Sequence, residues 1–396
     1  MLKPSPYGWI SQYFLGFFFA YGVYLPFWSL WFKEQGVSPT DIGLLVGLGL
    51  ATRCVANLVI TPRIHRVERL MPTLRWLSFA ALIFVGFHFF TGGNFWLMAL
   101  ATVLFNLCCG PVVPLSDAMA NYYARLKMLD YGRTRLWGSL AFIGGSTVVG
   151  YLVAEFGSDM ILYTAIVGIL VSLLFAMRNT NPMPVTLGSQ HAERPKLSTL
   201  LTDKPVIKFL VLASLIQGSH AAYYGFSAIH WKTAGHSEDV IGYLWSLGVA
   251  AEVAVFAMSK RLFAGWSLRT MFVVAACGVM MRWGITAGTT SIVALVIVQL
   301  LHGVTFAAAH IAAIQYIQNS EENKMVALQA LYNAIPLGAF IALMTVLSGW
   351  GYEHWGAAVF WAMAAMGLIA LFIKLEPQQP ATHAVDLSDN ALETQN

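Results

Sequence analysis

Long apolar segments separated by short polar connections make up most of the chain. A helix that crosses a bilayer needs about 20 mainly apolar residues, and twelve such segments fit between residues 9 and 374. They run near residues 9–32, 40–62, 72–91, 95–121, 131–154, 159–178, 205–230, 238–259, 267–287, 291–315, 325–349 and 354–374. Helix-start signals such as Ser38-Pro39 and Ser237-Glu238 precede some of them. The pattern predicts an all-α polytopic membrane protein with twelve transmembrane helices.

Two polar stretches divide this pattern. Residues 179–204 contain three prolines and form the longest break between apolar segments. We therefore predict an N-terminal six-helix bundle over 1–178, a linker over 179–204 and a C-terminal six-helix bundle over 205–375. Residues 376–396 are polar, and their composition predicts a disordered tail.

The two predicted bundles repeat each other when the chain is shifted by 199 residues. Turn positions coincide, because Gly36 meets Gly235 and Ser38 meets Ser237. The other matches are Tyr24 with Tyr223, Phe27 with Phe226, Lys33 with Lys232, Ile42-Gly43 with Ile241-Gly242, and Leu48-Gly49 with Leu247-Gly248. Since each half has an even number of spans, the halves share one orientation and form a parallel repeat about an axis along the membrane normal.

Composition and charge placement add an orientation. The chain is 58% hydrophobic and 11% charged, whereas soluble domains carry about 25% charged residues. Of 23 Lys and Arg residues, 19 lie on the side of the termini and the linker, only Lys33 and Lys232 lie on the other side, and Arg53 and Arg282 lie within spans. The positive-inside rule then predicts that both termini and the linker are cytoplasmic. The net charge of +4 is small, and we expect no nucleic-acid partner.

The sequence contains no motif for a metal, a cofactor or direct use of ATP. No CxxC, HExxH or Walker pattern is present, and the four cysteines lie within apolar segments as expected of packing residues. No nucleophile constellation or added catalytic domain is evident either. We therefore expect no cofactor and no metal, and we do not expect an enzyme.

Ionisable residues inside the predicted spans are the main functional signal, because a charge at the bilayer centre costs about 2.5–3.5 kcal/mol on insertion scales. The candidates are Arg53, Asp117, Arg135, Glu252, Arg282, His220, His302 and His310. Arg53 and Glu252 are repeat-equivalent, so an ion pair between the halves is a structural alternative for them. A helix cap is the alternative for Asp117, and packing is the alternative for the histidines.

The charge balance of these candidates favours an anionic substrate. Three arginines, Arg53, Arg135 and Arg282, face two acids, Asp117 and Glu252, which leaves one positive charge without a partner. A carboxylate would supply that partner, because arginine binds it through two parallel hydrogen bonds.

Aromatic residues crowd the two repeat-equivalent helices that begin each half. Tyr24 and Trp28 lie in the first span, and Tyr223 and Tyr224 lie in the seventh. Interfacial or lipid-facing positions are the alternative for any single ring. Together they are typical of a cavity wall for an aromatic body.

Glu252 is the predicted proton site. Burial favours the neutral form of a carboxyl group, and a neighbouring arginine favours the ionised form, so such a pair can act as a switch. We expect the arginine to exchange Glu252 for the substrate when proton and substrate bind together.

Three segments resemble the major facilitator superfamily, in the branch that contains lactose permease. They are residues 22–31 (GVYLPFWSLW), 114–117 (PLSD) and 131–138 (YGRTRLWG). The resemblance implies a substrate site at Asp117 and Arg135, and proton coupling through Arg282 and His302. It also implies a monomer in the bacterial inner membrane, in contact with lipid and with a small organic anion and a proton as partners.

Further segments resemble a subgroup of that branch, the bacterial phenylpropionate transporters. They are residues 130–139, 220–229, 243–248 and 282–284, together with Arg53 and Glu252. This resemblance implies proton-coupled uptake of an aromatic monocarboxylate such as 3-phenylpropionate by alternating access.

Two departures from lactose permease argue against sugar recognition. Thr305 and Val249 stand where that branch carries acids. A sugar or nucleoside symporter, a drug or metabolite exporter, and a membrane sensor remain the alternative functions.

Overall fold

The computed structural model describes residues 3–64, 66–185 and 200–375. The predicted tail, 376–396, and the middle of the predicted linker, 186–199, lie outside the described residues. The first half comprises α1 (Pro6–Glu34), α2 (Pro39–Val59), α3 (Leu70–Phe87), α4 (Phe95–Cys109), α5 (Val112–Arg125), α6 (Tyr131–Phe156) and α7 (Asp159–Ala176). The second half comprises α9 (Lys204–Gly218), α10 (Ala221–Thr233), α11 (Glu238–Leu262), α12 (Leu268–Gly288), α13 (Ile292–Leu300), α14 (Ala309–Gln318), α15 (Glu322–Ala334), α16 (Phe340–Trp355) and α17 (Val359–Leu371). The short elements are η1 (Thr61–Arg63), η2 (Val67–Arg69), η3 (His88–Phe90), η4 (Gly303–Ala308), η5 (Ile335–Ala339) and η6 (Gly356–Ala358).

The predicted transmembrane spans correspond to helices in the structure. In the described part of the chain, 11 helical stretches are long and apolar enough to cross a membrane. The last of them, Lys324–Leu371, has 48 residues and covers two predicted spans. Gly356 takes a φ of +55° at the turn η6 that separates α16 from α17, so this stretch crosses twice. The prediction of an all-α, multi-pass membrane protein is confirmed.

The repeat appears in the turns as well as in the helices. Gly36 and Gly235 both adopt left-handed backbone, with φ of +82° and +96°, where a side chain would be strained. Ser38 and Ser237 follow them as extended N-cap residues of α2 and α11. The 199-residue repeat therefore matches equivalent local geometry in both halves.

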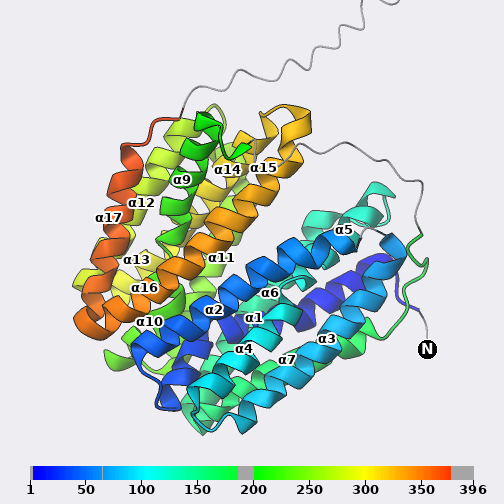
Figure 1. The fold of residues 1–396 in the computed structure, drawn as a ribbon, viewed down its shortest axis with the longest axis horizontal. Helices are drawn as coiled ribbons and strands as arrows, with labels where there is room; N and C mark the ends of the chain where they lie inside the picture. The colour runs from blue at the N-terminus through cyan, green and yellow to red at the C-terminus, as the bar shows by residue number, and fades with distance from the viewer. Residues whose placement is uncertain (1–2, 65, 186–199, 376–396) are drawn as a thin grey trace, which may run out of the picture.

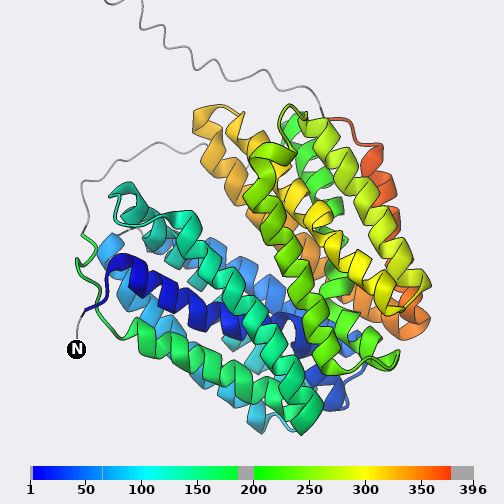
Figure 2. The same cartoon turned by 180° about the vertical axis from the view of Figure 1, so that it is seen from behind.

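The two halves pack against each other at one end and diverge at the other. Figures 1 and 2 show the divergence toward the end where α5, α14 and α15 lie. The contacts between halves join α2 to α16, α6 to α11 and α1 to α10. We call the end that holds the loops 35–38 and 234–237 the closed end.

Glycines permit the close approach at the closed end. A Cβ added at Gly43 would lie 2.7 Å from the Gly349 Cα of the other half. A Cβ added at Gly242 would lie 2.4 Å from the Ser146 carbonyl oxygen. Gly43 and Gly242 are repeat-equivalent, so each half presents the same kind of contact to its partner helix.

Two spans of the second half contain a π-helical turn. The element η4 lies between α13 and α14, and η5 joins α15 to α16. Such turns occur frequently at functional sites. Here η4 carries Thr305, and His302 directly precedes it, so the irregular turn lies at the ionisable residues that the sequence singled out.

Candidate functional site

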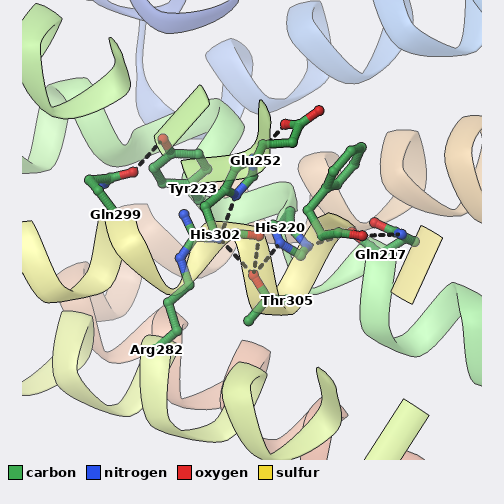
Figure 3. A network of polar contacts seen from close by, with 9 residues as sticks. Gln217, His220, Tyr223, Glu252, Arg282, Gln299, His302 and Thr305 are labelled. Carbon is green, nitrogen blue, oxygen red and sulfur yellow. Dashed lines mark hydrogen bonds and ion pairs between the residues drawn. The ribbon is translucent and has the colours of Figure 1, made fainter. Parts of the chain in front are cut away.

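A buried polar network in the second half centres on Arg282 of α12 (Figure 3). This side chain has 0% of its surface exposed. Its Nη1 donates to His302 Nδ1 at 2.8 Å and to Thr305 Oγ1 at 3.1 Å. The guanidinium carbon lies 4.7 Å from the ring centroid of Tyr223 and 4.3 Å from that of Trp283. Hydrogen bonds and aromatic faces thus offset part of the cost of burying this cation.

Glu252 of α11 is the most exposed member of this network. Its Oε2 lies 3.3 Å from His302 Nε2, and its side chain is 25% exposed against 7% for His302. His302 therefore stands between Glu252 and Arg282 (Figure 3). In this structure Arg282 does not pair directly with Glu252, because the ring of His302 lies between them. The exchange of an arginine between Glu252 and the substrate stays a prediction.

Asp117 of α5 and Arg135 of α6 lie together in the first half, as the family resemblance implies. Arg135 Nε is 3.9 Å from Asp117 Oδ1, and the two side chains are 33% and 26% exposed. The guanidinium also lies over the ring of Phe18, 4.1 Å from its centroid. Across the halves, Arg135 is close enough to Glu252 to interact with it electrostatically. The Asp117–Arg135 pair on α5 and α6 thus lies near Glu252 on α11 of the other half.

Arg53 of α2 differs from the other two arginines because no described carboxylate lies within ion-pair distance of it. Its Nε is buried and has no hydrogen-bond partner in the described part of the chain. The guanidinium carbon lies 4.7 Å from the ring centroid of Tyr21 and 5.6 Å from that of Tyr24. Phe17 and Phe105 line the same small cavity beside Arg53. Arg53 is therefore a cation held by aromatic faces, without an acid.

The predicted aromatic residues lie at different depths. Tyr24 is 8% exposed and bonds Asn106, whereas Trp28 is 2% exposed and packs against Phe105 and His88. Trp28 therefore belongs to a buried aromatic cluster, and it presents little surface to a substrate in this conformation.

The corresponding tyrosines of the second half are neighbours. Tyr223 is 1% exposed and stacks on Trp245 with 4.4 Å between ring centroids. Tyr224 is partly buried, and it interacts electrostatically with Tyr21 of the first half. Tyr224 is therefore the predicted aromatic residue of α10 that faces the other half.

The three predicted histidines are separated by the structure into two groups. His220 is fully buried, with its Nε2 3.1 Å from Thr305 Oγ1, so it belongs to the Arg282 network. His302 lies in the same network. His310 lies farther along the same span, with Nδ1 2.9 Å from Tyr332 Oη. Its link to Glu252 is electrostatic, without a hydrogen bond.

Two buried amides were missing from the sequence predictions. Asn106 of α4 donates to Tyr24 Oη at 3.0 Å, and Tyr223 Oη donates to Gln299 Oε1 of α13 at 3.0 Å. The sequence did contain a signal for them. The fourth span carries Asn106, and the tenth span, which is its counterpart in the second half, carries Gln299. The two amides therefore fix repeat-equivalent tyrosines, Tyr24 and Tyr223.

Residues 7–363 match the MFS_1 like family. The chain belongs to this family. It is 44% identical over 374 residues to an Escherichia coli (strain K12) protein described as a "Probable 3-phenylpropionic acid transporter", with 92% of this chain and 96% of the relative covered. Maltose permease of Geobacillus stearothermophilus is 25% identical over 347 residues, with 87% and 86% covered. The predicted resemblance to the major facilitator superfamily and to the phenylpropionate subgroup is confirmed.

Solved transporter structures share the fold of this family member. The nucleoside transporter NupG superposes with a TM-score of 0.77 at 15% identity, over 93% of this chain and 97% of that one. The POT family transporter PepTSo gives a TM-score of 0.68 at 10% identity, over 94% and 97%. At such identities the likeness concerns the fold alone, and it confirms the predicted fold class.

Proposed function

We propose that this family member is a secondary active transporter that takes up an aromatic monocarboxylate, such as 3-phenylpropionate, together with a proton. The observation that carries the proposal is Arg53, a partly exposed cation without a carboxylate partner among the described residues. Arg282 is fully buried, and Arg135 already faces Asp117. Arg53 is thus left to pair with an anionic substrate. The name of the E. coli relative supports the same substrate class.

Arg53 binds the carboxylate in this proposal, and aromatic rings bind the rest of the substrate. A guanidinium can donate hydrogen bonds to a carboxylate along its edge while its face stacks on aromatic rings. The face of Arg53 stacks in this way on Tyr21 and Tyr24. Tyr224 contributes a ring from the second half. Three other predicted binding residues are at most 2% exposed and pack behind the partly exposed binding groups: Trp28, His220 and Tyr223.

Asp117 and Arg135 form a second polar contact for the substrate. The 3.9 Å between their closest charged atoms exceeds an ordinary hydrogen bond. Both side chains are partly exposed. A substrate group can therefore enter between them without first breaking a short bond.

Glu252 carries the proton in this proposal. Its carboxylate is partly exposed, and its Oε2 lies 3.3 Å from Nε2 of His302. A carboxyl group in the low dielectric of a membrane protein takes up a proton readily. Protonation removes the negative charge that would repel an incoming carboxylate, so proton and substrate binding are linked.

The contacts between the halves support alternating access. The closed end is packed through Gly43 and Gly242, whereas the halves diverge at the opposite end (Figure 1). A rocking motion of one half against the other would exchange the two ends. With the charge distribution predicted above, the closed end faces the periplasm of a bacterial inner membrane, and the termini face the cytoplasm.

Uptake into vesicles tests the proposal. Proteoliposomes with an imposed inward pH gradient are offered labelled 3-phenylpropionate, lactose or uridine in parallel. We expect accumulation of 3-phenylpropionate alone, abolished by a protonophore. Absence of 3-phenylpropionate uptake would remove the proposal, and uptake of lactose or uridine would establish the sugar or nucleoside alternative.

An arginine variant tests the carboxylate contact. Arg53→Gln should raise the KM for 3-phenylpropionate at least tenfold, because a hydrogen bond to a charged group contributes about 1.5–3 kcal/mol. Arg133→Gln is the matched control, since Arg133 is exposed on α6. An unchanged KM in Arg53→Gln would contradict the assignment.

A further inference from the structure

The hydrogen bonds of Arg282 determine where His302 carries its proton. Arginine can only donate hydrogen bonds, and Arg282 Nη1 lies 2.8 Å from His302 Nδ1. Nδ1 must therefore be the unprotonated, accepting nitrogen. A neutral imidazole then holds its proton on Nε2, which lies 3.3 Å from Glu252 Oε2. His302 thus accepts from Arg282, and its protonated nitrogen is the one that lies beside Glu252 (Figure 3).

The same reasoning orients His220, on the other side of Arg282. Its Nδ1 lies 3.2 Å from the carbonyl oxygens of both Ile216 and Gln217, which can only accept, so Nδ1 carries a proton. Its Nε2 then accepts from Thr305 Oγ1 at 3.1 Å. Thr305 Oγ1 accepts in turn from Arg282 Nη1. The bonds run in one direction, from Arg282 through Thr305 to His220.

A second proton on His302 would break this order. It would have to occupy Nδ1, where Arg282 already donates. The two cations would then face each other in a site where His302 is 5% and Arg282 is 0% exposed. Buried like charges in contact are strongly unfavourable. The rings around His302, Phe306 at 5.4 Å, His220 at 5.5 Å and Tyr223 at 6.0 Å between centroids, carry no negative charge. The carboxylate beside His302 is that of Glu252, which lies at Nε2 and not at the Nδ1 that faces Arg282.

Glu252 meets different surroundings. The ionisable groups near it are His302, His310 of α14, Arg135 of α6, and Tyr223 and Tyr224 of α10. The N–H of a neutral His302 can donate to the carboxylate, and it can donate equally to the carbonyl oxygen of the protonated acid. Glu252 can therefore change its protonation while His302 keeps its tautomer.

We propose that Arg282 is a positioning residue that holds His302 as the neutral Nε2–H tautomer throughout transport, so that His302 orients Glu252 and never carries the proton. Thr305 and His220 hold Arg282 in place from behind. This inference rests on the proton-coupled function proposed above. It departs from the family resemblance, which implies that His302 takes part in proton coupling itself.

Nitrogen NMR of the full-length protein with ¹⁵N-labelled histidine tests the tautomer directly. The His302 signals are assigned by their loss in His302→Gln. From about pH 5 to about pH 9, a range that brackets ordinary histidine titration, we expect a protonated Nε2 and a bare Nδ1 throughout. An imidazolium pattern, or a proton on Nδ1, would overturn the proposal. In Arg282→Gln, His302 should become titratable, and an unchanged His302 spectrum in that variant would also contradict it.

Transport by two variants tests the consequence. The amide of His302→Gln can accept from Arg282 and donate to Glu252, so gradient-driven accumulation should stay within about threefold of the wild type, as one neutral hydrogen bond replaces another. Glu252→Gln should lose accumulation and retain substrate exchange. His354→Gln, at an exposed histidine of α16, is the matched control.

The two proposals fail in different ways. If His302→Gln loses accumulation while it keeps exchange, His302 carries the proton and the positioning role is wrong. If the wild type itself shows no gradient-driven accumulation, the proposed function is wrong, and the NMR measurement still decides the tautomer of His302.

Discussion

The two halves carry opposite charges at the same position of the repeat. Arg53 lies on α2 of the first half, and Glu252 lies on α11 of the second. Arg53 is surrounded by tyrosines and has no described acid beside it. Glu252 contacts a histidine that is held by a buried arginine. The comparison teaches that one duplicated frame presents a cation without a described acid on one side and a carboxylate beside a histidine on the other.

The frame around these charges is conserved between the halves in its geometry. Tyr24 bonds Asn106, and a Cβ added at Gly49 would lie 2.8 Å from Asn106 Nδ2. In the second half, Tyr223 bonds Gln299, and a Cβ added at Gly248 would lie 2.8 Å from Gln299 Oε1. A tyrosine hydroxyl, an amide side chain and a glycine thus meet in each half. The halves therefore differ in their charged residues and not in this support.

The largest effect is expected from exchanging the two charges. The double variant Arg53→Glu with Glu252→Arg should lower transport at least about 100-fold and reduce the folded yield. It buries an acid among tyrosines and places a cation beside His302 and Arg282, at about 2.5–3.5 kcal/mol for each uncompensated charge. Initial uptake rates and size-exclusion profiles measure both effects. A swapped protein that still transports would show that the charges are interchangeable between the halves.

The closing contacts should be equally sensitive in both halves. Gly43→Leu and Gly242→Leu each force a side chain into backbone of the other half. Overpacking costs about 1–3 kcal/mol, so each variant should shift the population about 5- to 150-fold away from the closed end. Accessibility of an engineered cysteine near loop 35–38 reports the shift.

Gly144 provides the control for these variants. An added Cβ at Gly144 meets nothing within 4 Å, so Gly144→Leu should leave the accessibility unchanged. An effect of Gly43→Leu without one of Gly242→Leu would show that the two contacts are not equivalent in the motion.

A smaller and symmetrical effect is expected at the buried amides. Asn106→Leu and Gln299→Leu should each destabilise the protein by about 1 kcal/mol, since each removes one partner of a tyrosine hydroxyl. Thermal unfolding in detergent measures the change, and Leu107→Ala at an exposed position of α4 is the control. A much larger loss in one half would mean that its amide also serves the transport site.

The smallest effect is expected at the closed end's lysines. Lys232 Nζ lies 3.0 Å from Glu34 Oε1 and 2.8 Å from Glu238 Oε1, whereas Lys33 donates to the neutral Thr233 at 3.1 Å. Partly exposed ion pairs contribute about 0.2–1 kcal/mol and weaken in salt. Glu34→Gln should therefore open the closed end by less than about fivefold, an effect that high salt removes.

The neutral counterpart supplies the control for that measurement. Thr233→Val removes the acceptor of Lys33 without removing a charge, so its effect on opening should be independent of salt. A salt-independent effect of Glu34→Gln would contradict an electrostatic role for its pair with Lys232.

The spans, the repeat and the identity of the charged candidates could be predicted from the sequence alone. Apolar length determines which segments cross a bilayer. The 199-residue shift that aligned Gly36 with Gly235 also placed Arg53 opposite Glu252. These properties are local, since they depend on the order of residue types along the chain.

Only the tertiary structure decided which of these residues meet. His302 lies between Glu252 and Arg282 although 50 and 20 residues separate it from them. Trp28, one turn beyond Tyr24, lies in a buried aromatic cluster. The position of a residue along a helix determines how deep that residue lies in the membrane. The partner of its side chain depends instead on how the helix is rotated and on which other helices pack against that helix. That rotation is set by packing over the whole bundle, so charge pairing could not be read from the sequence.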